Sequence, residues 1–430
     1  MLTTRPRPIT VLIATEFFFP DIGGIETHVL KLSQNLIKLG FKVVVLTRGF
    51  GDRRGIRYMS NGLKVYHIPS KGFIEPCGLC TFMDLFPIYR NILIREQVDI
   101  IHTHQGSSRF KYEIMLWGSL MGYRTVFTDH SLFSFSDLGP AFLNEVLKHF
   151  SVFEDHIICV SNRHRENLVL RAEIDPRNVS VIGNALDSKE FKSTIRPSYD
   201  KIIIVVISRL TERKGIGLLI KVIPIVCQRH DNVFFIIGGD GPMFPNVKAT
   251  IDKYYLHDRI KLLGSVPNHK VCKVLEQGHI FLSTSQTESF CIALLEAASC
   301  GLISVATRVG GVPEVLPKDM ILLSEYDANS IADRIDDAIA ILPNTNNKGF
   351  HERIKNMYSW EKVSKNVANV YFKILSYPKL SLYERFKRLY HLSNYFGKIV
   401  IMMSAIAYIE WASSEWDEID ISPDWANFHL

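Results

Sequence analysis

The chain has 430 residues, enough for two or three domains with sizeable cores. Its composition is that of an ordinary globular protein, 47% hydrophobic and 22% charged, and its net charge of +6 suits an anionic ligand or a membrane surface without proving either. The seven cysteines are an odd number and lie mostly inside apolar runs, so they indicate small core residues in a reducing compartment and argue against a disulfide framework.

The N-terminal stretch is predicted to form a buried strand, Ile9 to Ala14. It does not fit a signal peptide, because Glu16 interrupts the apolar run and no small-residue cleavage site follows. Apolar runs and helical patterns then alternate, which predicts a doubly wound parallel sheet. The expected strands are 42–47, 63–68, 98–104, 125–129, 156–161 and 179–182, and the expected helices lie near 82–96, 112–121, 141–150 and 163–172.

Polar residues stand where several of these strands end. His102 and His104 close one strand, and His130 follows another between an aspartate and a serine. A lone histidine is usually structural, but one at the carboxyl end of a parallel strand can face an active-site cleft. His130 is the best candidate of the fifteen histidines. Cys77 and Cys80 form a lone C-x-x-C without the second ligand pair that a zinc site needs.

A polar stretch, Asp187 to Asp200, reads as a linker to a second series of strands and helices that begins at Lys201. The predicted fold is therefore α/β, with two Rossmann-like domains facing a cleft. The expected divisions are an N-terminal domain at 1–190, a second domain at 201–345, a helical segment at 346–377 that returns to the first domain, and a tail at 378–430.

The most informative stretch is Ser283 to Thr307, which reads as strand, turn, helix and strand. Its predicted helix, 290–300, begins at the carboxyl edge of the sheet, where a helix N-terminus suits an anion. Glu288 and Glu296 flank that N-terminus, roughly 12 Å apart if the intervening residues are helical. Such carboxylates could accept hydrogen bonds from paired sugar hydroxyls. On the spacing alone, two solvated glutamates on a surface helix would be the better interpretation. The placement at a strand–turn–helix junction makes the two interpretations about even.

Cations and glycines follow other strands. Arg209 and Lys214, spaced R-x4-K after one strand, suit a diphosphate, although isolated loop cations of this kind are more often simply exposed. Gly23 and Gly24 would let backbone approach a phosphate, and the alternative is a plain turn. The stretch 238–242, GGDGP, is weak as a dinucleotide fingerprint. The chain contains no D-x-D, so the usual metal–diphosphate clamp of the other large sugar-transferase fold is missing.

Together these features resemble retaining GT-B glycosyltransferases of the family-4 type, and within them the PIG-A-type family, the catalytic subunits of phosphatidylinositol N-acetylglucosaminyltransferase. The resemblance covers most of residues 9 to 325. It is carried by stretches such as FFFPDIGGIETHVLKLSQNLI, VFTDHSLFSFSD, SRLTERKGIGLL and TESFCIALLEAASCGL. Cys291 stands where broader family-4 enzymes usually carry glycine, and Gly183 replaces the usual proline before Asn184.

The resemblance implies transfer of N-acetylglucosamine from UDP-GlcNAc to phosphatidylinositol, the first step of GPI-anchor biosynthesis, with retention of configuration. Glu296 would hold the ribose, Glu288 the donor sugar, and Arg209 and Lys214 the departing diphosphate. Backbone N–H groups at Gly24, Phe290 and Cys291 would add to the donor site, beside Gly23, and His130 would lie near sugar and acceptor. The resemblance implies no cofactor and no metal, no nucleic acid, further subunits of a membrane complex, and a place on the cytoplasmic side of the endoplasmic reticulum membrane.

The tail after Pro378 interleaves basic and aromatic residues and ends in an apolar run, Ile399 to Ile409. The family carries a transmembrane helix here, but the run of eleven residues is shorter than the roughly 20 that a span needs, so an interfacial helix on an anionic surface is expected. A buried C-terminal helix is the alternative. The acidic end with Trp411, Trp416 and Trp425 could contact partner subunits or headgroups.

Three other functions remain open on the sequence. A family-4 transferase with a different lipid or sugar acceptor would keep the same donor site. A GT-B sugar-nucleotide epimerase would need no lipid and no membrane tail. A non-catalytic scaffold subunit would have no reason to keep Glu288, Glu296, Arg209, Lys214 and His130 together.

Overall fold

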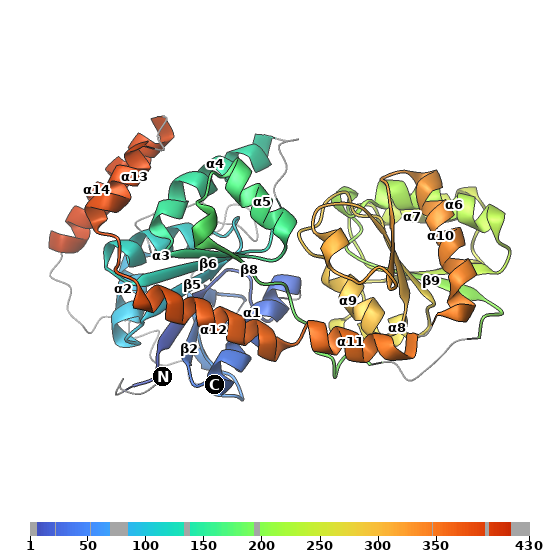
Figure 1. The fold of residues 1–430 in the computed structure, drawn as a ribbon, viewed down its shortest axis with the longest axis horizontal. Coiled ribbons are helices and arrows are strands. Elements are labelled where there is room, and N and C mark those ends of the chain that lie inside the picture. The colour runs from blue at the N-terminus through green and yellow to red at the C-terminus, as the bar shows by residue number, and fades with distance from the viewer. Residues whose placement is uncertain are drawn as a thin grey trace. The chain divides into compact units, whose positions relative to one another are not determined.

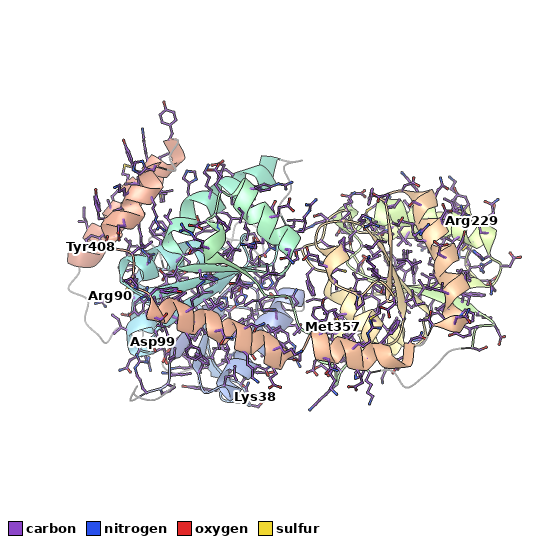
Figure 2. The ribbon with its side chains drawn as sticks, viewed as in Figure 1. Lys38, Arg90, Asp99, Arg229, Met357 and Tyr408 are labelled. Atoms are coloured by element: carbon purple, nitrogen blue, oxygen red, sulfur yellow. The ribbon has the colours of Figure 1, made fainter. Side chains whose placement is uncertain are left out.

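The computed structural model describes residues 7–21, 23–51, 53–68, 85–132, 138–192, 198–345, 347–391 and 395–413. The chain forms two compact units. The first comprises Met1–Val160, His164–Ile182 and Glu361–Leu430, and the second comprises Ser161–Arg163 and Gly183–Trp360. Each unit is a sheet with helices on its faces (Figure 1). Side chains fill the space between each sheet and its helices (Figure 2).

The first sheet has eight strands in the order β3-β4-β2-β1-β5-β6-β7-β8. The strands are β1 (Thr10–Ala14), β2 (Lys42–Arg48), β3 (Gly55–Tyr58), β4 (Lys64–Ile68), β5 (Ile100–His104), β6 (Arg124–Asp129), β7 (His156–Cys159) and β8 (Val179–Val181). All pairs are parallel except β3 with β4. The central strands β1 and β5 are buried throughout, as expected when helices cover both faces of a parallel sheet.

Eight helices belong wholly or mostly to this unit in the described ranges. They are α1 (Gly24–Lys38), α2 (Phe86–Arg95), α3 (Arg109–Leu120), α4 (Leu138–Phe150), α5 (Asn162–Arg171), α12 (Trp360–Ser376), α13 (Leu382–His391) and α14 (Tyr395–Ser413). The short 3-10 helices are η1 (Ser151–Phe153) and η2 (Pro176–Asn178). Strand order turns between β1 and β5, and ligands of open α/β sheets bind outside the carboxyl ends of strands at such a point.

The second sheet has six parallel strands in the order β11-β10-β9-β12-β13-β14. Its strands are β9 (Ile202–Ile207), β10 (Val233–Gly238), β11 (Ile260–Gly264), β12 (Ile280–Ser283), β13 (Ile303–Thr307) and β14 (Ile321–Ser324). Its helices are α6 (Ile216–Arg229), α7 (Phe244–Lys253), α8 (Asn268–Leu275), α9 (Ile292–Ser299), α10 (Ala328–Ile341) and α11 (Phe350–Met357). The 3-10 helices are η3 (Glu212–Lys214), η4 (Val312–Glu314), η5 (Leu342–Asn344) and η6 (Asn347–Gly349).

The helical segment expected at 346–377, with one helix from about His351 to Leu375, is not a single helix. The structure forms two helices, α11 and α12, which Figure 1 shows as separate ribbons. Tyr358 and Ser359 separate them in the chain. Tyr358 leaves the helical conformation, its hydroxyl donates to the Val315 carbonyl at 2.6 Å, and its own carbonyl accepts from the Leu186 amide at 3.0 Å. These hydrogen bonds to distant residues interrupt the helix. The local sequence pattern does not reveal them.

The C-terminal helices pack on the first unit. Leu389 of α13 and Val400 of α14 are almost fully buried in the same apolar cluster as Trp117 of α3. The opposite face of α14 is apolar and exposed at a helical spacing, through Ile399, Met402, Ile406 and Ile409. None of the helices in the described ranges is long and apolar enough to cross a membrane. Cys77, Cys80, Trp416 and Trp425 lie outside the described residues.

Candidate active site

Lys214 and Glu288 form an ion pair at the carboxyl edge of the second sheet. Lys214 ends η3, which follows β9, and Glu288 lies in the turn after β12; β9 and β12 are neighbours in the sheet. Ser285 donates its hydroxyl to Glu288 Oε1 at 3.0 Å. Both charged side chains are mostly covered, with 27% of Lys214 and 12% of Glu288 exposed. Parallel pairing of β9 with β12 thus brings a cation and a carboxylate together across 74 residues of sequence.

Gly215 makes this pairing possible. It lies between η3 and α6 with a φ of +70° and a ψ of +30°, in the left-handed region. A Cβ atom here would lie 1.6 Å from the Thr284 carbonyl oxygen. The Thr284 hydroxyl donates to the Gly215 carbonyl at 3.0 Å. The backbone after Lys214 therefore lies directly against the backbone that leads to Glu288, an approach that leaves no room for a side chain.

We expect Gly215→Ala to destabilise the second unit strongly. Gly264→Ala is the matched control, because Gly264 also has a positive φ (+66°) but nothing lies within 4 Å of its added Cβ. The control should lose about 1–3 kcal/mol of unfolding free energy through backbone strain alone. Gly215→Ala adds a backbone collision and should lose clearly more. Equal losses in thermal or urea unfolding would show that the close approach to Thr284 is unimportant.

The helix after Glu288 begins later than the sequence predicts. The expected helix starts at Phe290, whereas α9 starts at Ile292, because Cys291 has a φ of +74° and a ψ of +78° as its N-cap residue. The separation of roughly 12 Å expected between Glu288 and Glu296, which assumed helix throughout, therefore does not apply. Burial and the nearby Glu288 carboxylate raise the pKa of the Cys291 thiol to about 12, so the thiol stays protonated and is no nucleophile.

Glu296 lies on α9, one helical turn and a half beyond the bend at Cys291. Burial, and after it the neighbouring Glu190 carboxylate, raises the pKa of Glu296 to about 7. The group is therefore divided between its acid and carboxylate forms near neutral pH. A bound diol that donates hydrogen bonds would favour the carboxylate form.

Arg209 is exposed in the loop that follows β9. The glycine-rich stretch after β10 supports this loop, since the Asp240 carbonyl accepts from the Leu210 amide at 2.8 Å. Gly239, at a φ of +143°, brings its backbone so close to Ser208 that a Cβ atom would lie 1.8 Å from the Ser208 carbonyl oxygen. The GGDGP stretch thus holds the arginine loop in position, which is a structural reason for its glycines.

The remaining predicted residues lie in the first unit. Gly23 is the extended N-cap residue of α1, and Gly24 is the first residue of that helix. His130 directly follows β6, and its imidazole Nε2 lies 3.0 Å from Nδ1 of His104, the last residue of β5. Burial lowers the pKa of both imidazoles well below the usual value, so both are neutral at physiological pH.

Sequence reasoning missed His28, which lies on α1 and contacts the His130 ring edge-on with ring centroids 4.7 Å apart. It noted His104 at the end of its strand but preferred His130 as the candidate histidine. His102 has a structural role, since its ring bonds the Tyr371 hydroxyl of α12 at 2.6 Å and the Thr128 hydroxyl at 2.7 Å. This contact joins α12 to the first sheet.

Two Rossmann-like sheets, each with polar or charged groups at the carboxyl ends of its strands, are the architecture of the GT-B fold. Residues 187–356 match the group 1 glycosyl transferases, and residues 48–137 match the PIGA family (GPI anchor biosynthesis). The fold is similar to that of sucrose-phosphate synthase from Thermosynechococcus elongatus, with a TM-score of 0.72 over 86% of this chain and 100% of that chain. Identity to it is 18%, so this likeness concerns the fold alone.

Similarity to named relatives shows which family the chain belongs to. The chain is 46% identical over 408 residues to the A subunit of phosphatidylinositol N-acetylglucosaminyltransferase from Arabidopsis thaliana, covering 95% of this chain and 91% of the relative. It is 41% identical over 415 residues to the Homo sapiens protein of the same name, covering 95% and 85%. The chain therefore belongs to the PIG-A family of phosphatidylinositol N-acetylglucosaminyltransferases, and it is a glycosyltransferase.

Proposed function

We propose that this enzyme transfers N-acetylglucosamine from UDP-GlcNAc to the inositol of phosphatidylinositol, with retention of anomeric configuration, in the first step of GPI-anchor biosynthesis. The observation that carries the proposal is similarity over 95% of the chain to relatives whose names state this sugar and this lipid. The paired Lys214 and Glu288 at the carboxyl edge of the second sheet fit the same chemistry.

The donor is proposed to bind the second unit. The Glu296 carboxylate accepts hydrogen bonds from the ribose hydroxyls. The Glu288 carboxylate accepts hydrogen bonds from hydroxyls of the donor sugar. Lys214 and Arg209 neutralise the diphosphate as it leaves, which stabilises charge that develops in the transition state. The backbone N–H groups of Phe290 and Cys291, at the start of α9, add to this stabilisation.

The first unit is proposed to serve the acceptor and the reacting sugar. His130 is assigned to the reacting sugar and the acceptor, and the N-terminus of α1 at Gly23 and Gly24 is assigned to a phosphate. The acceptor hydroxyl attacks from the face that the diphosphate leaves, and the departing phosphate oxygen takes its proton. This same-face route retains the anomeric configuration without a protein nucleophile.

The C-terminal helices are proposed to lie on the cytoplasmic surface of the endoplasmic reticulum membrane, in a complex with further subunits. The exposed residues Ile399, Met402, Ile406 and Ile409 form one apolar stripe along α14. Lys387, Arg388 and Lys398 are exposed on α13 and α14 and suit anionic headgroups. An enzyme whose acceptor is a membrane lipid gains by resting on that membrane.

The test is a transfer assay in membranes that express the chain with its partner subunits. Labelled UDP-GlcNAc and phosphatidylinositol are supplied, and label is sought in the organic phase in a form that a phosphatidylinositol-specific phospholipase releases. Lipid-bound label that depends on this chain supports donor and acceptor together. Bound donor without any labelled lipid would reject phosphatidylinositol as the acceptor and leave the donor site unaffected.

UDP-GlcNAc binding should strengthen as pH rises through about 7. The pKa of Glu296 is raised to about 7, so the carboxylate that accepts the ribose hydroxyls is scarce at pH 6 and dominant at pH 8. Titration of this single group predicts about tenfold tighter binding across that interval. Calorimetry at several pH values measures it, with UDP-GlcNAc as ligand because its diphosphate does not titrate there.

Two variants sharpen this pH experiment. Glu296→Gln should bind more weakly and lose the pH dependence. Glu190→Gln removes the second cause of the raised pKa and should move the midpoint to lower pH. A Glu296→Gln protein with an equally steep pH dependence would assign the titration to another group.

A further inference from the structure

Three histidines from distant parts of the chain meet at the carboxyl edge of the first sheet. His28 comes from α1, His104 ends β5, and His130 follows β6. Their ring centroids are 4.7 Å (His28–His130), 5.4 Å (His104–His130) and 5.5 Å (His28–His104) apart. Each ring offers one nitrogen such that the three nitrogens lie within 4.8 Å of one another.

A hydrogen bond between His104 and His130 accounts for only part of this arrangement. The bond uses Nδ1 of His104 and Nε2 of His130, 3.0 Å apart. The other ring nitrogen of His104, Nε2, is buried and has no hydrogen-bond partner within the part of the chain that the structure describes. The His104 side chain is fully buried. A buried imidazole nitrogen without a partner is costly, and its presence at a strand end calls for a ligand.

The Asp129 side chain connects the two loops next to His104 and His130. Asp129, the last residue of β6, accepts hydrogen bonds through Oδ1 from the amides of Gly106 at 3.3 Å and Ser131 at 3.2 Å. This carboxylate therefore ties the loop after His104 to the loop that contains His130. Such support from groups behind the ligands is typical of metal sites.

The donor set fits a zinc-like ion. Neutral imidazole is the form of histidine that binds a metal ion, and three imidazole rings meet here. Nitrogens bound to one Zn²⁺ at about 2.0–2.1 Å in a tetrahedral arrangement lie about 3.4 Å apart. The three imidazole nitrogens here lie within 4.8 Å of one another. Three histidines leave a fourth position open for an oxygen ligand.

We propose that His28, His104 and His130 bind one divalent transition-metal ion of the zinc class at the carboxyl edge of the first sheet. This proposal departs from the expectation, implied by the family resemblance, that the protein binds no metal. That expectation rested on the cations Arg209 and Lys214 of the second unit serving the donor diphosphate. The histidine site lies in the other unit. It shares His130 with the proposed acceptor region and adds a metal ion that the proposed function does not include. Its open position takes an oxygen atom, from water or from a phosphate.

Cobalt binding to the full-length chain tests the site, with Co²⁺ as a visible probe for Zn²⁺. The protein, with any affinity tag removed, is treated with a chelator, dialysed and titrated with Co²⁺. We expect one ion per chain with the intense visible absorption of a low-coordinate site, and displacement of that ion by Zn²⁺. Metal analysis of the protein as purified should find a transition metal in the same proportion.

Variants identify the ligands. His104→Gln and His28→Gln should each weaken Co²⁺ binding by at least about tenfold. His156→Gln is the matched control, because His156 is also buried but begins β7 at the opposite edge of the sheet and bonds the Ser180 hydroxyl at 2.8 Å. It should leave Co²⁺ binding unchanged. Circular dichroism checks that each variant is folded, and reversal of the wild-type signal by chelator needs no variant.

Binding and activity are read separately. A wild-type chain that binds no Co²⁺, or a folded His104→Gln chain that binds it as tightly as the wild type, overturns the metal site. Either result leaves the transferase proposal intact if label still enters the lipid. Conversely, a chain that binds one Co²⁺ through these histidines supports the site even where the transfer assay fails.

Discussion

Glu288→Gln is expected to lower kcat/KM for UDP-GlcNAc by about 10²–10³-fold while the protein stays folded. The substitution keeps the shape of the side chain and removes its charge. Lys214 then loses the carboxylate that orients its ammonium group, and the donor sugar loses a charged acceptor. Both effects act on the transition state more than on bound substrate, so kcat should fall more than KM rises. Steady-state assays in the membrane system measure the two constants.

Asp319→Asn is the matched control for this prediction. Asp319 also pairs with a cation in the second unit, Arg353, at 3.0 Å between Oδ1 and Nη2. The pair is exposed, and Asp319 directly precedes β14, at the edge of the sheet opposite Glu288. Exposed ion pairs contribute little to stability, so the variant should stay folded. Because the pair lies at the other edge of the sheet from Glu288, the transferase activity should be unchanged. If the Glu288→Gln enzyme kept more than half of the wild-type activity, Glu288 would have no catalytic role.

The Glu288→Gln, Lys214→Met double variant separates the two roles of Glu288. If Glu288 acts only by orienting Lys214, the double variant should be no worse than Lys214→Met alone. If Glu288 also holds the sugar, the double variant should lose further activity. We expect the further loss.

Arg385→Met is expected to detach the C-terminal helices from the first unit and to cost about 3–5 kcal/mol of unfolding free energy. Arg385 of α13 is 1% exposed, and its Nη2 donates to Asp155 Oδ1 at 2.7 Å. Its other terminal nitrogen donates to the Ser119 hydroxyl of α3. Methionine fills similar space but leaves the Asp155 carboxylate partly buried without its cation. Urea unfolding of the full chain measures the loss.

Arg388→Met controls for the loss of a positive charge on the same helix. Arg388 lies one turn further along α13 and is exposed, so its removal should change stability by less than about 0.5 kcal/mol. Limited trypsin digestion adds a second readout, because α13 carries Lys387 between the two arginines. Faster cleavage there in Arg385→Met, at an unchanged rate elsewhere, would show that the helices detach before the unit unfolds. Equal stability of the two variants would contradict the anchoring role.

Local sequence patterns predicted most of the strands and helices, usually to within a few residues at each end. The continuous apolar runs of β1, β9 and β10 are typical of strands buried on both faces, and glycines such as Gly40 and Gly301 end the helices as expected. The short edge strand β3 escaped prediction because it is only four residues long and half polar. The break between α11 and α12 escaped because bonds to distant backbone cause it.

The candidate site could be predicted in part. Glu288, Glu296, Arg209 and Lys214 were identified because each follows a predicted strand or lies in a predicted helix, and because their stretches resemble a known family. The bend at Cys291 was not predicted. Cysteine disfavours the left-handed backbone conformation, which the packing around the turn imposes here. Neither local pattern nor spacing could show the raised pKa of Glu296, which depends on burial by the surrounding fold.

The sequence by itself determined the two sheets, because short-range periodicity predicts their strands and helices. It also determined the family and the candidate residues of the donor site, because contiguous motifs contain them. The tertiary structure alone decided which of those residues meet. Lys214 reaches Glu288 across 74 residues, Arg385 reaches Asp155 across 230, and His28 meets His104 and His130. These long-range contacts depend on strand order and helix packing. Interactions throughout the chain determine that arrangement, so no single position in the sequence reveals it.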